Sequence, residues 1–103
     1  MRKAKGLSET DIKHQIAQYL TYAGAFNFHL LAGIGAYKGA PDKIFIYKGE
    51  SVYLEIKTAT GVQSDYQKAF QAAVERAGGV YALVRSVDDV IGIIAEINAV
   101  KGE

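Results

Sequence analysis

Two short strand-like runs joined by a glycine turn place the tightest limit on how this chain can fold. Residues 43–47 (Lys-Ile-Phe-Ile-Tyr) and 52–56 (Val-Tyr-Leu-Glu-Ile) are rich in the β-branched and aromatic residues typical of strands. Between them, Gly49-Glu50 suits a two-residue type II′ turn with glycine first. The sequence therefore predicts an antiparallel β-hairpin here.

The position of the turn determines which side chains oppose each other across the hairpin. A two-residue loop at Gly49-Glu50 places Asp42 opposite Lys57 and Ile44 opposite Glu55. Directly opposed residues share a face of a sheet, as do residues two apart on a strand, so Asp42, Glu55 and Lys57 are predicted to point the same way. The other face is predicted to carry the apolar side chains of Phe45, Tyr47, Val52, Leu54 and Ile56.

Two carboxylates and an amine are unusual at strand positions where Val or Ile would fit. A divalent cation would relieve the repulsion between Asp42 and Glu55, and carboxylate oxygens with water and phosphate completing the shell are typical of Mg²⁺ or Mn²⁺. The alternative is a solvated hairpin face on which Glu55 and Lys57 form a weak surface ion pair. The Gly-Ala-Pro-Asp segment at 39–42, placed across the hairpin, favours the metal site.

These residues and two later blocks resemble a known nuclease family. Pro-Asp at 41–42 followed by Glu-Ile-Lys at 55–57 is similar to the signature of the PD-(D/E)xK nucleases. With Gly-Val-Gln-Ser-Asp-Tyr-Gln-Lys-Ala-Phe at 61–70 and Val-Arg-Ser-Val-Asp-Asp-Val at 84–90, the chain resembles the virus-type replication-repair nuclease (VRR-NUC) domain from about Ser8 to Val90. The resemblance implies an α/β fold with a restriction-endonuclease-like core, a small mixed β-sheet flanked by helices.

The resemblance also implies roles for residues outside the central motif. Family members carry an acidic residue near the start of the first helix that reaches the metal site, which would be Glu9, and a glutamine near the catalytic lysine, which would be Gln67. The backbone carbonyl of Ile56 would be a further metal ligand. Glu9 and Gln67 also have structural explanations, because acidic residues stabilise helix N-termini and Gln67 completes a capping box with Ser64.

The function implied is that of a metal-dependent endodeoxyribonuclease, active on branched DNA in repair, as Holliday junction resolvases are. Asp42, Glu55 and Lys57 would be catalytic, with Gln67 and Glu9 beside them and Mg²⁺ or Mn²⁺ as cofactor. Stand-alone relatives are expected to act as homodimers, since a two-fold enzyme suits a two-fold junction. The alternative is a catalytically inactive nucleic-acid-binding or interaction module on the same fold.

Capping residues and hydrophobic spacing predict the element order αβββαβα. Serines open three predicted helices, from Ser8 to Gly24, from Ser64 to Gly78 and from Ser86 to about Val100, while residues 26–31 and 80–85 are predicted strands. Apolar residues at helical spacing are predicted to share a face in each helix: Ile12, Ile16 and Leu20; Phe70, Val74 and Ala77; Val90, Ile91, Ile94 and Ile97.

A glycine-rich segment at 32–41 precedes Asp42. It lacks the Gly-x-x-x-x-Gly-Lys-[Ser/Thr] pattern of a P-loop, and no organic cofactor is expected. Candidates for contact with a nucleic-acid backbone are Tyr37, Lys38, Lys43 and His29. The alternatives are a plain connecting loop and a half-exposed strand histidine. Asp88 and Asp89 are interpreted as capping residues rather than a second metal site, and Arg85 is given no role.

Composition sets the remaining limits. A chain of 103 residues suffices for one small domain over 1–103, with a basic arm at 1–7 expected to be flexible. The absence of cysteine excludes thiolate metal sites. No apolar run approaches the ~20 residues of a spanning helix, and no signal peptide is recognisable, so we expect a cytoplasmic protein of a bacterium or phage-infected cell, without membrane contact. The net charge of +1 does not by itself indicate DNA binding.

Overall fold

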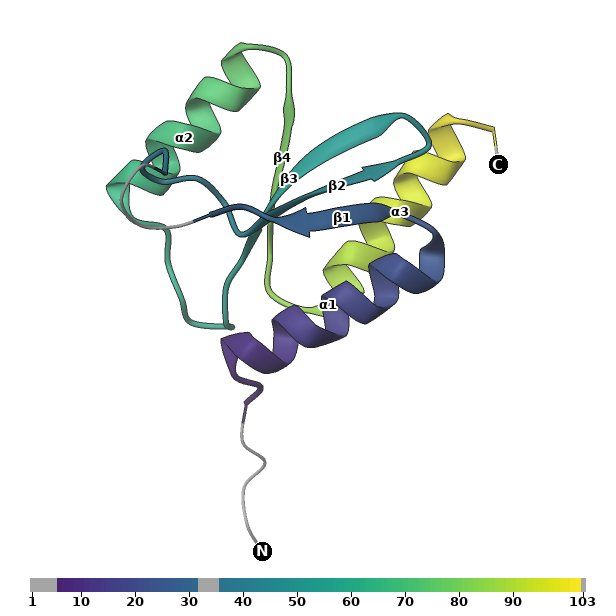
Figure 1. Ribbon diagram of the computed structural model, residues 1–103, viewed down its shortest axis with the longest axis horizontal. Helices are drawn as coiled ribbons and strands as arrows, with labels where there is room; N and C mark the ends of the chain where they lie inside the picture. Colours follow the sequence, from purple (N-terminus) through teal and green to yellow (C-terminus); the bar gives the residue numbers. More distant parts are fainter. Residues whose placement is uncertain (1–5, 32–35, 103) are drawn as a thin grey trace, which may run out of the picture.

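The computed structural model describes residues 6–31 and 36–102. Residues 1–5 of the expected basic arm and residues 32–35 of the glycine-rich segment lie outside the described part. The helices and strands follow one another in the predicted order αβββαβα (Figure 1). Their bounds are α1 Glu9–Ala23, β1 Phe26–His29, β2 Lys43–Tyr47, β3 Glu50–Ile56, α2 Asp65–Arg76, β4 Val80–Val84 and α3 Val87–Val100.

The four strands form one mixed sheet in the order β1-β2-β3-β4. β1 pairs with β2 and β2 with β3 in antiparallel fashion, while β3 and β4 are parallel. Parallel neighbours need a crossover connection, and α2 provides it between β3 and β4. The predicted small mixed sheet flanked by helices is therefore confirmed.

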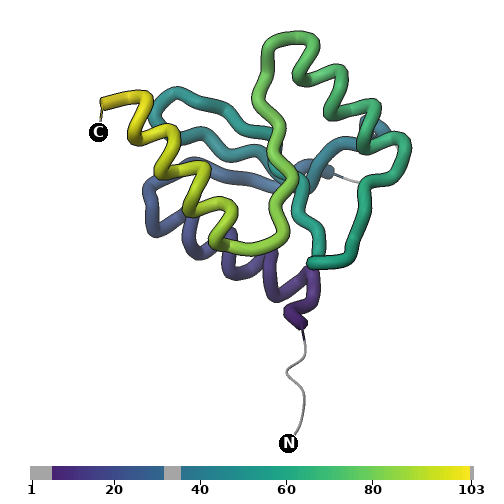
Figure 2. The backbone as a smooth tube through the Cα atoms, turned by 180° about the vertical axis from the view of Figure 1, so that it is seen from behind, coloured from purple at the N-terminus to yellow at the C-terminus, as the bar shows by residue number. Residues whose placement is uncertain are grey.

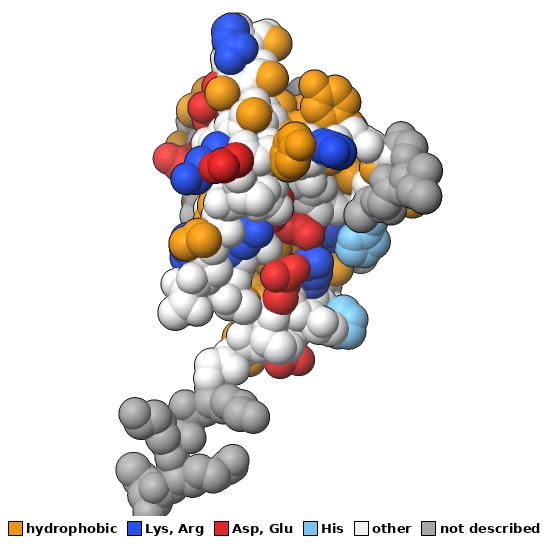
Figure 3. All heavy atoms as spheres, turned by 90° about the vertical axis from the view of Figure 1, so that its left-hand side faces the viewer, with side chains coloured by type: hydrophobic (Ala, Val, Ile, Leu, Met, Phe, Trp, Pro, Cys, Tyr) orange, Lys and Arg blue, Asp and Glu red, His pale blue; other side chains and the backbone are white. Residues whose placement is uncertain are grey.

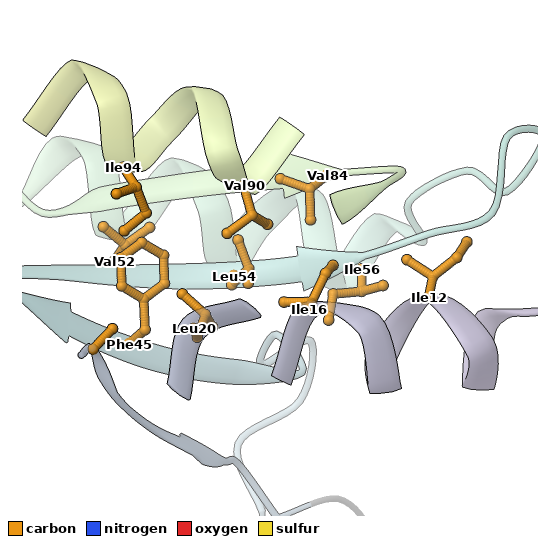
Figure 4. Close-up of a cluster of buried hydrophobic side chains, with 11 residues drawn as sticks. Ile12, Ile16, Leu20, Phe45, Val52, Leu54, Ile56, Val84, Val90 and Ile94 are labelled. Atoms are coloured by element: carbon orange, nitrogen blue, oxygen red, sulfur yellow. The ribbon is translucent and has the colours of Figure 1, made fainter. Parts of the chain in front are cut away.

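The hydrophobic core lies between the sheet and two helices, α1 and α3, which lie side by side on one face of the sheet (Figures 1 and 2). Figure 4 shows apolar side chains from both helices meeting those of β2, β3 and β4. The buried residues are Ile12, Ile16, Leu20, Ala25, Phe45, Val52, Leu54, Ile56, Val84, Val90 and Ile94. The hairpin residues predicted to be apolar and inward are in this cluster or, for Tyr47, packed against it.

Helix α2 lies apart from α1 and α3 and contacts β4 (Figure 1). The Phe70 ring packs against those of Tyr53 in β3 and Tyr81 in β4, with ring centroids 6.0 and 6.5 Å apart. Tyr53 alternates along β3 with the core residues Val52 and Leu54, so it projects from the opposite face of the sheet. That second face is the one that carries Glu55.

The hairpin turn lies one residue earlier than predicted. Tyr47 pairs with Glu50, so the turn residues are Lys48 and Gly49. Their φ angles of 49° and 83° are both positive, which makes the turn type I′ rather than type II′. The predicted pairing of Asp42 with Lys57 is therefore wrong, because Lys43 pairs with Leu54 and the next step brings Asp42 level with Glu55. Because the pairing shifts by two residues, an even number, Asp42 and Glu55 still lie on the same face of the sheet, as predicted.

Three smaller differences concern side-chain exposure and element length. β1 ends at His29 rather than at residue 31, and β4 ends at Val84 rather than at residue 85. Ile91 of α3, predicted to face inward, is exposed. No helix in the described part of the chain is long and apolar enough to cross a membrane.

Candidate active site

Asp42 stands at the entrance to β2 and is tied to the neighbouring strand. One carboxylate oxygen, Oδ2, accepts a hydrogen bond from the backbone N–H of Ile56 at 2.6 Å. The residues just before Asp42 lie directly against α2, since a Cβ on Gly39 would come within 2.1 Å of the Tyr66 carbonyl oxygen. Gly39 also has a φ of +82°. Only glycine fits this approach and this conformation, so the sequence sets the path of the chain into Asp42.

Glu55 is the buried centre of the site, with 3% of its surface exposed. Its Oε2 accepts a hydrogen bond from Gln67 Nε2 at 3.0 Å and lies 3.3 Å from Lys57 Nζ. Its Oε1 is buried and has no hydrogen-bond partner. Burial raises the pKa of Glu55 to about 7, the charge of Asp42 adds to this rise, and Lys57 opposes it.

Gln67 caps α2 and also contacts Glu55. Its backbone N–H donates to Ser64 Oγ, and its side-chain Oε1 accepts from the Ser64 N–H at 2.8 Å, which completes the capping box of α2. Its Nε2 is left free to donate to Glu55. Capping therefore holds the amide in place and aims its remaining donor at the carboxylate.

Lys57 follows directly after β3, and its backbone is fixed by the parallel strand, since its N–H donates to the Val84 carbonyl at 3.0 Å. Arg85 holds the loop that follows. Its Nη1 donates to the carbonyls of Thr58 at 2.6 Å, Gly61 at 2.7 Å and Ala59 at 3.3 Å. Nothing in the sequence signals this contact, because it depends on β4 lying beside β3.

Glu9 reaches the site only through Lys13. Lys13 Nζ lies 2.9 Å from Glu9 Oε2 and 3.0 Å from Asp42 Oδ1. Desolvation opposes the charge of Lys13, yet these two carboxylates together raise the pKa of its ammonium group above the ordinary value. The i, i+4 spacing of Glu9 and Lys13 predicts their pairing with each other, but the contact with Asp42 follows only from the packing of α1.

Of the four candidates for nucleic-acid contact, Lys43 is placed wrongly by the sequence prediction. It is 1% exposed, and its Nζ donates to Asn27 Oδ1 at 2.8 Å. Desolvation lowers the pKa of Lys43, with the charge of Asp42 opposing the change. Lys43 precedes Phe45 by two residues and so shares the core face of β2, where it cannot meet a nucleic acid.

The other three candidates are at the surface. His29 is exposed at the end of β1, while Tyr37 and Lys38 are exposed beside α2. Lys38 Nζ lies 4.9 Å from the centre of the Tyr66 ring. The Asp89 carboxylate accepts a hydrogen bond from the Arg85 N–H, and the Asp89 N–H donates to Ser86 Oγ. Both contacts are expected of a residue at a capped helix start.

The residues present suit a hard divalent cation that shares its coordination with water and phosphate. Within residues 6–31 and 36–102, no three His, Cys, Asp or Glu side chains cluster closely enough to enclose a metal ion. Mg²⁺ commonly binds through only one or two carboxylates, which Asp42 and Glu55 would supply. The buried and unpartnered Oε1 of Glu55 is an available oxygen ligand of the right kind.

Comparisons with known proteins place this geometry in a known fold. No family model and no curated protein matches the sequence. Among solved structures, a chain described as a VRR_NUC domain superposes with a TM-score of 0.73 at 19% identity, covering 84% of this chain and 94% of the other. A second, described as a VRR_NUC domain protein, gives a TM-score of 0.75 at 21% identity, covering 92% and 91%.

These matches agree with the resemblance seen in the Pro-Asp, Glu-x-Lys and Gln67 motifs, which the structure gathers at one place. At this level of identity they establish the fold. This chain has the fold of the two chains described as VRR_NUC domains.

Proposed function

We propose that this protein is a nuclease that hydrolyses phosphodiester bonds in DNA with the help of Mg²⁺ or Mn²⁺. The observation that carries the proposal is Glu55, a buried carboxylate with one oxygen unpartnered, beside Asp42 and Lys57. A structural role alone gives no reason to bury an incompletely paired carboxylate. The VRR-NUC fold supports the choice of reaction.

Asp42, Glu55 and the backbone carbonyl of Ile56 would hold the cation. When bound, it would lower the pKa of a water molecule and offset charge on the phosphate oxygens. Gln67 and Lys57 both engage Oε2 of Glu55, which leaves Oε1 as the oxygen that would bind the cation. The Ile56 N–H holds Asp42 through Oδ2, so Oδ1, which pairs with Lys13 in the absence of metal, would be the oxygen that turns to the cation.

Lys57 has a second task in this proposal. Its side chain is only 15% exposed, so its ammonium group is held close to Glu55 rather than free in solvent. From there it would orient the attacking water and stabilise negative charge that develops on the phosphate in the transition state. Arg85, by holding the loop after Lys57, would act as a positioning residue.

We further propose branched DNA as substrate and a homodimer as the active form, both suggested by the resemblance to stand-alone VRR-NUC nucleases. The first strand offers a surface for a second copy. Phe26 and Phe28 are exposed with ring centroids 5.5 Å apart, and Phe26 pairs with the exposed Ile46 on the neighbouring strand.

A double change of Phe26→Glu and Phe28→Glu should yield a monomer by light scattering, where the unaltered protein gives twice the chain mass. If the unaltered protein is also a monomer, the proposed homodimer is contradicted.

Cleavage of a labelled four-way junction, a flap and a plain duplex, each with Mg²⁺, Mn²⁺ or EDTA, tests the function. We expect metal-dependent cuts that favour the junction, and their loss in Glu55→Gln. Glu96→Gln, an exposed carboxylate on α3, is the matched control and should cut normally. Binding of all three DNAs without any cut would instead identify a nucleic-acid-binding module on the same fold.

A further inference from the structure

We propose that Tyr37, Lys38, Tyr66 and Phe70 form a stacking surface for an unpaired nucleotide of the DNA bound at the active site. This aromatic surface, defined by those four residues, lies beside the metal-binding carboxylates. The inference rests on the proposed nuclease function, and it adds that the DNA has an unpaired base close to the cleavage point.

The surface has the shape and exposure of a binding site. A hollow of about 450 Å³ is lined by Ala36, Tyr37, Lys38, Tyr66, Ala69 and Phe70, a size within the ~300–1,000 Å³ common for small-ligand sites. Tyr37 is 75% exposed and Tyr66 is 58% exposed. Two large aromatic side chains that line one hollow and stay open to solvent give folding little stability, which suggests that they meet a ligand.

Packing holds the aromatic surface in place. The Tyr37 ring stands edge-on to Phe70, with centroids 5.5 Å apart, and Phe70 in turn contacts Tyr53 and Tyr81 of the sheet. Lys38 is held over the Tyr66 ring by a cation–π contact. A base entering the hollow would therefore meet preorganised rings, with an ammonium group close enough to pair with its phosphate.

The aromatic surface and the active site share the same supports. Tyr66 immediately precedes Gln67, whose amide donates to Glu55. Tyr37 and Lys38 lie a few residues before Asp42, and the intervening Gly39 is packed directly on the Tyr66 backbone. Figure 3 shows this side of the molecule, with hydrophobic side chains gathered above a central group of acidic and basic ones. DNA placed at the carboxylates would therefore pass the aromatic surface.

Nucleic acid with an unpaired base is the ligand that best fits this chemistry. Every base has a π-face that stacks on aromatic side chains, but in an intact duplex both faces are already stacked on neighbouring pairs. The chain carries a net charge of only +1, so no overall excess of positive charge attracts the phosphates. Stacking of a base on the aromatic surface would supply part of the binding free energy that charge does not provide.

The test combines protein variants with matched DNAs. Binding is measured by fluorescence anisotropy in EDTA, so that no cleavage occurs, with a duplex containing a short single-stranded gap. A second duplex has abasic residues in the gap and keeps every phosphate. The protein variants are Tyr37→Ala and Tyr66→Ala, each with its Phe counterpart. Tyr22→Ala is the control, because Tyr22 is 87% exposed on α1, away from the hollow.

Stacking predicts that Tyr37→Ala and Tyr66→Ala each weaken binding of the gapped DNA by about 5- to 100-fold. Neither should change binding of the abasic gap by more than about twofold, and Tyr22→Ala and the Phe variants should bind as the unaltered protein does. Equal losses on the two DNAs, or no loss on either, would overturn the proposal.

The result separates this inference from the proposed function. A protein that shows the stacking pattern in EDTA but cuts no DNA with Mg²⁺ or Mn²⁺ would contradict the nuclease and leave the aromatic surface standing. In the opposite case, the protein cuts DNA with metal, but Tyr37→Ala and Tyr66→Ala change binding of the base-bearing and abasic gaps equally. That result would support the nuclease and contradict the aromatic surface.

Discussion

Burial of Glu55 is costly for folding, a cost that the proposed cation would offset. Its carboxylate loses most of its hydration, and only Oε2 recovers hydrogen-bond partners, from Gln67 and Lys57. The nearby charges of Asp42 and Glu9 also disfavour its ionised form. The folded, metal-free protein therefore binds the Glu55 proton more tightly than the unfolded chain does, and the free energy of unfolding depends on pH.

The sign of this dependence is the reverse of that for a carboxylate whose pKa is lowered in the folded protein by an ion pair. The pKa of Glu55 is about 7 in the folded protein against 4.5 ordinarily, so the folded state binds the proton more tightly. In EDTA, this residue's contribution should be fully present below pH 4.5 and lost as pH rises to about 7, a change of about 3 kcal/mol. Chemical denaturation across this range measures it. Glu55→Gln should remove the decline, and an unchanged pH profile in that variant would contradict the assignment.

Lys43 and Asn27 form a second buried polar group that the sequence does not predict. Because the ammonium of Lys43 is inside the protein, removing its partner should cost more than removing both. We expect Asn27→Leu alone to lower the free energy of unfolding by about 2–3 kcal/mol. The double variant Asn27→Leu with Lys43→Met should come within about 1 kcal/mol of the unaltered protein. Additive losses, measured by urea denaturation, would show that the two side chains do not act as a pair.

At the scale of the elements, the segment that leads into β2 is fixed by its contact with α2. Gly39 and Gly49 make a matched pair, since both have a φ close to +82° but only Gly39 has backbone atoms where a Cβ would be. Gly49→Ala should cost about 1–2 kcal/mol of stability from conformation alone. Gly39→Ala should cost about 1–3 kcal/mol more, because the first turn of α2 must move. Equal losses would mean that the two elements are not in contact.

The loop after β3 depends in the same way on β4. Arg85 donates to three carbonyls of residues 58–61, so Arg85→Ala should speed amide hydrogen exchange in that loop by at least about tenfold while the core helices keep their protection. Arg76→Ala, an exposed arginine on α2, is the control. Slow exchange in Arg85→Ala would contradict a positioning role.

At the scale of the whole molecule, local signals in the sequence predict most of the fold. Serine caps and glycine stops locate the helices, and alternation in 43–47 and 52–56 locates the hairpin, because these signals act over a few residues. The turn type was missed because Lys48 adopts a positive φ, which non-glycine residues rarely do. The burial of Lys43 was missed because it depends on which face of the sheet α1 covers.

The candidate site was predictable to the same extent. Strand alternation alone predicts that Asp42, Glu55 and Lys57 share a face of the sheet. The predicted register was wrong by two residues, and a shift by an even number leaves each side chain on the same face. Gln67 was recognisable as a cap, but its hydrogen bond to Glu55 follows only from the packing of α2. Lys13 and Arg85 carry no signal, since each reaches the site from an element distant in the sequence.

Cleavage and binding of the same labelled four-way junction, measured in parallel for Asp42→Asn and Lys57→Ala, test the proposed chemistry most directly. The unaltered protein should cut with Mg²⁺ and not with EDTA. Both variants should bind the junction within about threefold of normal, as measured by anisotropy, and cut at least about 100-fold more slowly. Cutting that persists in EDTA, or in Asp42→Asn, would show that these carboxylates are not the active site of a metal-dependent nuclease.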